Sequence, residues 1–97
     1  MITAIVLVQV DTDVIPETAQ RIADVDGVSE VWSVTGEWEL VAVVRVNSHD
    51  DIAGVVTGAI AKTPGVIATN TMIAFQQFSR RDLDRMWGVG MEGAEGI

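Results

Sequence analysis

Cysteine is absent from the 97-residue sequence, histidine occurs once, and six basic residues stand against fourteen acidic ones. Without cysteine the chain has no disulfides, thiolate metal sites or cysteine nucleophile. The formal net charge of −8 disfavours direct contact with nucleic acid, because phosphate binding needs a basic surface. Arginines gather only at Arg80, Arg81 and Arg85, a spacing typical of a solvated helix face. We therefore expect no direct nucleic-acid partner.

The sequence also contains few residues in patterns typical of catalysis or metal binding. His49 lies among acidic and polar residues at 47–51, but consecutive residues rarely converge on one metal ion. Acidic residues there suit the positive end of a helix dipole instead. A Ser-His-Asp triad has no credible arrangement here, and Gly88-Val89-Gly90 is placed unlike a phosphate-binding loop. The sequence predicts no metal, no cofactor and no catalytic residue.

The N-terminal residues 1–10 are apolar. This run is far shorter than a membrane span, and it lacks the basic segment and cleavage site of a signal peptide. We read it as a β-strand and expect a cytoplasmic protein without a membrane partner.

Hydrophobic periodicity divides the chain into strands and helices. Apolar residues recur at i, i+3, i+4, i+7 and i+8 from Ile15 and again from Ile52, which indicates two helices. Pro16 suits the first turn of the first helix, and Ser48 with Asp51 resembles a capping box before the second. Alternating or β-branched runs predict strands at residues 2–10, 28–35, 37–46 and 66–78.

The two halves of the chain resemble each other. A shift of 38 positions, without gaps, places Ala4 on Ala42, Ile22 on Ile60 and Gly27 on Gly65. Two βαβ halves predict an α+β, ferredoxin-like βαββαβ fold with a four-stranded antiparallel sheet. We place this domain at residues 1–79. Residues 80–97 are expected to form a short helix around Leu83, Met86 and Trp87, followed by a flexible glycine-rich tail.

The central strands of the predicted sheet are apolar on both faces. Ile5 and Leu7 alternate with Ala4, Val6 and Val8, yet two helices cover only one face. A second subunit packed sheet to sheet would bury the other, so we expect a homodimer of the dimeric α/β-barrel type.

Gly54 and Gly58 lie on one stripe of the second helix. They indicate either close approach to a neighbour, within the subunit or in a larger assembly, or a tolerated weak helix.

Two segments suggest a binding site. In the first, Gly36 precedes an aromatic residue flanked by acids, Trp38 and Glu39 among them; in the second, Thr69 and Thr71 share one face of the last strand. Taken with the Pro64-Gly65-Val66 that ends the second helix, their order resembles the ligand-binding (RAM) domain of the Lrp/AsnC, or feast/famine, regulators. The resemblance covers about residues 2–78.

The resemblance implies a dimeric ferredoxin-like barrel that assembles further into rings and binds small effectors, typically amino acids, between dimers. It implies ligand-binding roles for Gly36, Trp38, Glu39, Thr69 and Thr71, although Glu39 stands where the family usually has aspartate. The chain resembles the form without a helix-turn-helix, which implies effector sensing, transcription regulation through partners and co-assembly with full-length Lrp/AsnC regulators. On the residues alone, Gly36 can simply permit the turn, Trp38 pack at an interface and Glu39 be solvated.

Two other functions fit the same fold. One is a small dimeric-barrel enzyme such as a cofactor-free monooxygenase, with Trp32 or His49 in an apolar cleft inside each subunit. The other is an ACT-like regulatory domain, whose usual glycine after the first strand is missing from residues 11–14. We take the non-enzymatic, effector-binding interpretation as the main hypothesis.

Overall fold

Residues 1–80 are described by a computed structural model, and the helix and tail expected beyond them lie outside the described residues. Between strands β1 (Ile2–Val10) and β2 (Val28–Ser33) lie a short 3-10 turn (Thr12–Val14) and helix α1 (Ile15–Ala23). Strand β3 (Leu40–Val46) follows. Helix α2 (His49–Val55) continues into a π-helical segment (Val56–Ile60), and strand β4 (Val66–Ala74) ends the series.

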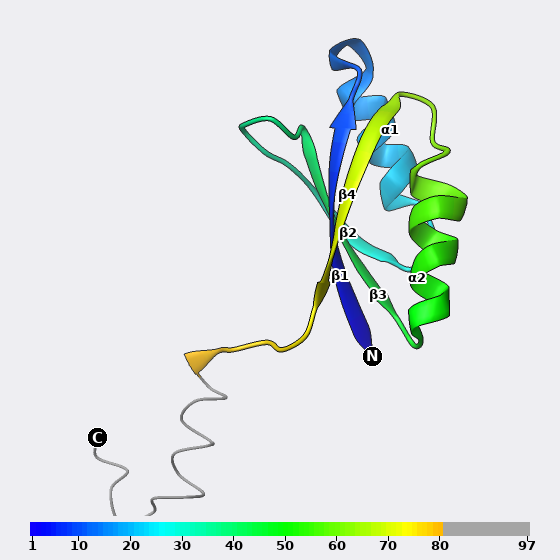
Figure 1. The fold of residues 1–97 in the computed structure, drawn as a ribbon. Helices are drawn as coiled ribbons and strands as arrows, with labels where there is room; N and C mark the ends of the chain where they lie inside the picture. The colour runs from blue at the N-terminus through cyan, green and yellow to red at the C-terminus, as the bar shows by residue number, and fades with distance from the viewer. Residues whose placement is uncertain (81–97) are drawn as a thin grey trace, which may run out of the picture.

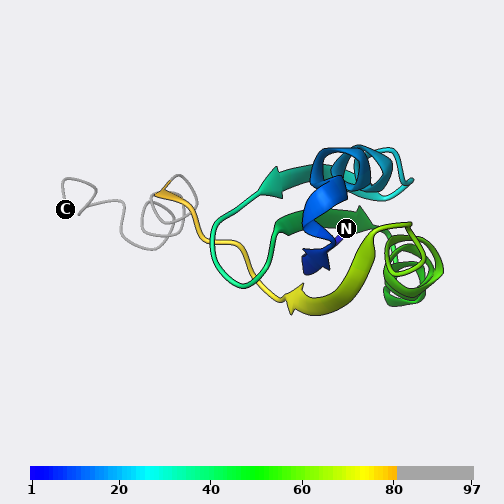
Figure 2. The same cartoon turned by 90° about the horizontal axis from the view of Figure 1, so that it is seen from above.

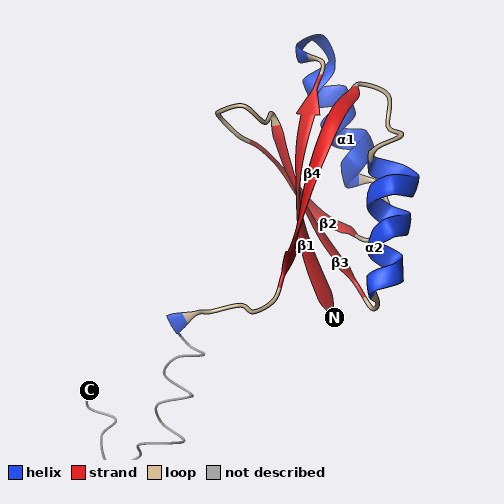
Figure 3. Ribbon diagram, viewed as in Figure 1, coloured by secondary structure: helices blue, strands red, loops and turns tan. Residues whose placement is uncertain are grey.

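The four strands form one antiparallel sheet in the order β2-β3-β1-β4, and both helices cover the same face (Figures 1 and 3). Figure 2 shows the two layers from above. On the opposite side, here called the open face, no helix of residues 1–80 lies against the sheet. The loop at residues 34–39 and the segment after β4 both extend from the body on the side of the open face (Figure 1). The predicted βαββαβ fold is confirmed.

The core lies between the sheet and the helices. In β1 every second side chain is buried, from Ala4 to Val10, because a strand turns alternate side chains to one face. Ile22 of α1 and Ile60 of the π-helical segment are completely buried against them. Each such isoleucine contributes roughly 1.5–3 kcal/mol relative to an exposed one.

The internal repeat seen in the sequence is also present in the structure. Gly27 and Gly65, equivalent under the 38-residue shift, both enter the strand that follows with positive φ, +97° and +99°. Ile22 and Ile60 are equivalent and equally buried. The two central strands, β1 and β3, are likewise the first strands of the two halves. Each half therefore folds as the same strand–helix–strand unit.

The strand ends differ from the expected ones. The expected strands 28–35 and 37–46 end at Ser33 and begin at Leu40, because the chain opens into a loop around Gly36 (φ +113°) that needs residues from both. The last strand stops at Ala74 instead of residue 78. Thr3 is the partner of Ala74, and β1 offers almost no chain beyond it to continue the ladder.

Candidate functional site

The loop at residues 34–39 joins β2 to β3 and carries three of the expected ligand-binding residues. A backbone hydrogen bond from Val34 N to Glu39 O (3.0 Å) closes it. Gly36 is exposed at its tip, where a positive φ favours glycine and a Cβ would meet no atom within 4 Å. Trp38 and Glu39 are half-buried at its return into β3. Gly36 therefore permits the turn without bringing the backbone close to another segment.

Glu39 ties this loop to the end of β1. Its Oε2 accepts a hydrogen bond from Val10 N at 2.8 Å, and its own backbone N–H donates to Val8 O at 3.1 Å. The register between β1 and β4 shifts at Gln9 and Val10, so the Val10 amide leaves the regular ladder at this point. The carboxylate satisfies that amide, and its two oxygens retain lone pairs for further donors. Glu39 is thus an anchored, half-buried acid and not a solvated one.

Thr69 and Thr71 lie on edge strand β4. They are opposite Val8 and Val6 of β1, and directly opposite residues of an antiparallel pair share a face. Both threonines are therefore on the helix-covered side, half-buried at the edge of the sheet. The pattern correctly placed them on one face.

The structure brings some of the expected site residues together. Leu40, which follows Glu39, and Thr69 pair with Val8 from opposite sides of β1. Two strand spacings, roughly 9.6 Å in total, separate them across the sheet. Glu39 and Thr69 therefore flank the C-terminal end of β1 on different sides, and Thr71 lies one side-chain repeat further from that end.

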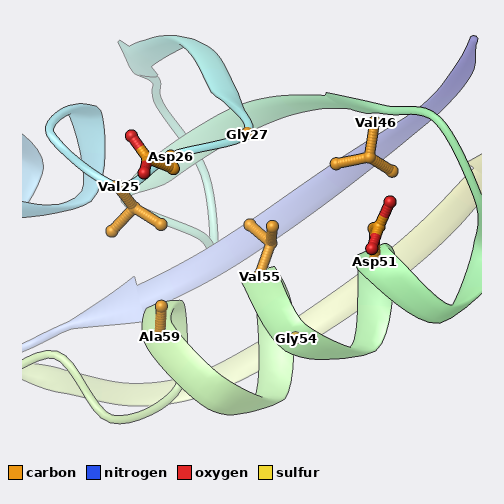
Figure 4. Close-up of a pocket in the computed structure, with 8 residues that line it drawn as sticks. All are labelled: Val25, Asp26, Gly27, Val46, Asp51, Gly54, Val55 and Ala59. Carbon is orange, nitrogen blue, oxygen red and sulfur yellow. The ribbon is translucent and has the colours of Figure 1, made fainter.

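A groove that no sequence pattern predicted lies on the helix side (Figure 4). It has a volume of about 490 Å³ and runs between the turn at residues 25–27, the end of β3 and helix α2. Apolar side chains line most of it, and Asp26 and Asp51 contribute a carboxylate from two different elements (Figure 4). Gly27 permits the close packing here, since a Cβ would lie 2.7 Å from Cγ2 of Val55.

The open face has an apolar centre and a polar border. Strand pairing places Trp32, Val41 and Leu7 in one row and Val43, Ile5 and Met72 in the next. Trp32 is 59% and Met72 48% exposed, so residues 1–80 leave apolar side chains uncovered on both edge strands of this face. The border is formed by Gln9, Asn70, Glu30, Arg45 and Thr3.

Within residues 1–80, no three His, Cys, Asp or Glu side chains lie close enough together to hold a metal ion. His49 is exposed in the first turn of α2. No helix of this part of the chain is long and apolar enough to cross a membrane.

The fold, the loop at 34–39 and the uncovered sheet define a small α+β domain of the ferredoxin-like type. The profile of the Lrp/AsnC ligand binding domain matches residues 3–84, so the chain belongs to that family. The expected family resemblance is confirmed.

Individual relatives agree with this membership. The HTH-type transcriptional regulator PH1916 of Pyrococcus horikoshii is 37% identical over 76 residues, which are 75% of this chain and 51% of that protein. The chain therefore spans about half the length of the curated relatives it matches. The crystal structure of TTHA0845 from Thermus thermophilus has a TM-score of 0.78 and 39% identity, over 82% of this chain and all of that one. The feast or famine regulatory protein Rv3291c of M. tuberculosis, complexed with L-methionine, has a TM-score of 0.69 and 25% identity, over 84% of this chain and 55% of that one.

Proposed function

We propose that this chain is an effector-binding and oligomerisation module that senses an amino acid or a similar small molecule and modulates transcription through protein partners. The observation that carries the proposal is the match to the Lrp/AsnC ligand binding domain over nearly the whole described chain. The L-methionine complex of a relative with the same fold supports an amino acid as the class of effector. Full-length regulators of the family are the partners that fit this module.

The proposed effector site lies at the end of β1 that meets the loop at 34–39. A free amino acid needs an anion for its ammonium group and N–H donors for its carboxylate. Glu39 supplies the first with the lone pairs left by its bond to Val10 N, and the exposed backbone around Gly36 supplies the second. Trp38 provides an apolar wall. Thr69 and Thr71 lie across β1 on the helix-covered side, so their half-buried hydroxyls would meet only a ligand that reaches around the end of β1.

The open face is the proposed dimer interface. An apolar centre within a polar border is the usual anatomy of a protein–protein interface, and aromatic and methionine side chains are enriched there. Trp32 and Met72 have this character, and they lie on different edge strands, so a partner sheet that covers both must cover the whole face. Two sheets packed face to face at about 10 Å would form the dimeric α/β barrel. Further association of dimers into a ring would then enclose the effector sites.

Calorimetric titration of the full chain with L-methionine, followed by the other common amino acids, tests the effector site. Thr69→Val removes a hydroxyl from the proposed site at nearly constant volume, and we expect it to weaken binding at least about fivefold, because an unpaired ligand group costs about 1–3 kcal/mol. Thr57→Val on the exposed side of the π-helical segment is the matched control and should bind as the natural chain does. Equal affinities for the two variants would contradict the proposed site.

A further inference from the structure

The four strands contain only two charged residues, and these have opposite signs. Glu30 lies on β2 and Arg45 on β3, and both are exposed on the open face. Strands β1 and β4 have none. Glu30 is opposite Val43, and Arg45 lies two residues further along β3. Diagonal neighbours of this kind are roughly 7–8 Å apart, so an anion and a cation stand close together on an otherwise uncharged sheet.

Arg45 is held in place by an irregularity in the sheet. The pairing of β2 with β3 shifts between Val28 and Glu30, which leaves Ser29 as an extra residue in a bulge. Ser29 Oγ donates to Val43 O at 3.1 Å and accepts from Nη1 of Arg45 at 2.8 Å. Bulges commonly re-aim side chains near functional sites. A guanidinium group has five N–H donors, so this bond orients Arg45 and leaves it capacity to bind an anion.

Both charged side chains line one cavity of about 480 Å³ on the open face. Besides the two charged residues, three of its lining residues are polar and uncharged, Thr3, Gln76 and Gln77, and the others are apolar. The apolar lining residues are Met1, Ile5, Val43, Ala74 and Phe75, of which Met1 and Phe75 are almost fully exposed.

We propose that this cavity is a second ligand site, which binds a free α-amino acid as its zwitterion. Arg45 binds the carboxylate, Glu30 binds the ammonium group, and the ligand side chain packs on Ile5 and Val43. One fixed cation and one anion match a zwitterion, whereas an amine or a carboxylic acid alone would leave one of them unpaired. The class of ligand rests on the proposed function, whereas the location of the site on the open face rests on the structure alone.

This cavity is remote from the loop at 34–39. It lies beside Thr3 and Ala74 at the N-terminal end of β1, whereas Glu39 bonds to Val10 at the other end. A strand of this length spans about 27 Å at 3.3 Å per residue, so one ligand cannot occupy both places. A second copy packed on the open face would close the cavity and remove water from it, which strengthens the charge contacts.

Titration of the full chain with L-methionine, by calorimetry, tests this second site. The natural chain should bind two ligands per protomer. Arg45→Gln and Glu30→Gln should each weaken binding at the second site at least tenfold and leave binding at the loop site unchanged. Arg21→Gln on α1 removes the same charge as Arg45→Gln at an exposed position and should retain both. With 3-methylthiopropylamine, which lacks the carboxylate, the natural chain and Arg45→Gln should bind equally weakly at this site.

Two results would overturn the inference. If only Thr69→Val reduces binding and Arg45→Gln has no effect, the site at the loop stands and the second site falls. If Arg45→Gln instead lowers the mass measured by sedimentation without changing ligand binding, the charges join two protomers. Conversely, loss of binding in Arg45→Gln and Glu30→Gln but not in Thr69→Val supports the second site and contradicts the site at the loop.

Discussion

Substituting alanine for each of three glycines separates two contributions to the loss of stability when a Cβ is added. One is backbone strain, and the other is the collision of the new methyl group with its neighbours. Gly36, Gly27 and Gly65 all have positive φ, between +97° and +113°. A residue with a Cβ in the left-handed region costs roughly 1–2 kcal/mol. Because this cost is shared, any difference among the three variants reports the surroundings of the new methyl group.

The surroundings differ in a graded way. A Cβ at Gly36 meets no atom within 4 Å, so we expect only the backbone cost of roughly 1–2 kcal/mol. A Cβ at Gly27 would lie 2.7 Å from Cγ2 of Val55 and 3.2 Å from Cγ1 of Val46. These methyl groups end short side chains that shift slightly, so a total of about 2–3 kcal/mol is expected with the overpacking cost.

Gly65 should be the most costly position. A Cβ there would collide with Oγ1 of Thr18 and lie 3.0 Å from Cγ2 of Val14. Thr18 is completely buried and donates to Pro64 O at 3.1 Å, so it cannot rotate away without losing that bond. Together with the backbone cost, overpacking of about 1–3 kcal/mol and a lost hydrogen bond of about 1 kcal/mol bring the total to roughly 3–6 kcal/mol.

Urea unfolding of the full chain, followed by circular dichroism at one protein concentration, measures the series. Gly54→Ala is the control, because this helical glycine has no atom near a new Cβ and alanine should stabilise the helix by up to about 1 kcal/mol. Equal losses at Gly36 and Gly65 would refute the contact argument. A marked loss for Gly54→Ala would show that α2 contacts a neighbouring subunit there.

Three further predictions concern single contacts and surfaces. Glu39→Ala leaves the Val10 amide without its acceptor and should lower the free energy of unfolding by about 1–3 kcal/mol. The control Glu37→Ala, at an exposed position, should change it by less than about 0.5 kcal/mol, and equal urea midpoints for the two variants would contradict this prediction. Trp32→Ser should lower the mass measured by analytical ultracentrifugation at micromolar concentration, because it weakens the contact within each dimer, and an unchanged mass would exclude the open face as the interface. The full chain should not retard duplex DNA in a gel at physiological salt; a retarded band that Arg80→Ala abolishes would show the opposite.

The sequence was enough to predict the fold because its signals are local and repeated. The alternation in β1, the helical spacing from Ile15 and the two glycines that precede Val28 and Val66 each depend on neighbouring residues only. They agree with one another after the 38-residue shift, and the structure has each of them. The strand ends were less predictable, because β4 stops where β1 offers it no further partner, and only the register defines that point.

The site was less accessible from the sequence. The pattern placed Thr69 and Thr71 on one face, but their position on the helix-covered side depends on pairing with β1. The bond from Val10 N to Glu39 joins residues 29 positions apart, and no local pattern encodes it. Glu30 and Arg45 are the only charged residues in the four strands, and the sequence alone could have shown this. Their closeness in space depends on the bulge at Ser29, which the sequence does not reveal.

Native mass spectrometry of the full chain, with and without the twenty common amino acids, tests the central claim most directly. The proposed effector-binding module predicts dimers and even-numbered assemblies above the dimer that retain a bound amino acid. A monomer, or a plain dimer that retains none of the twenty, would contradict it.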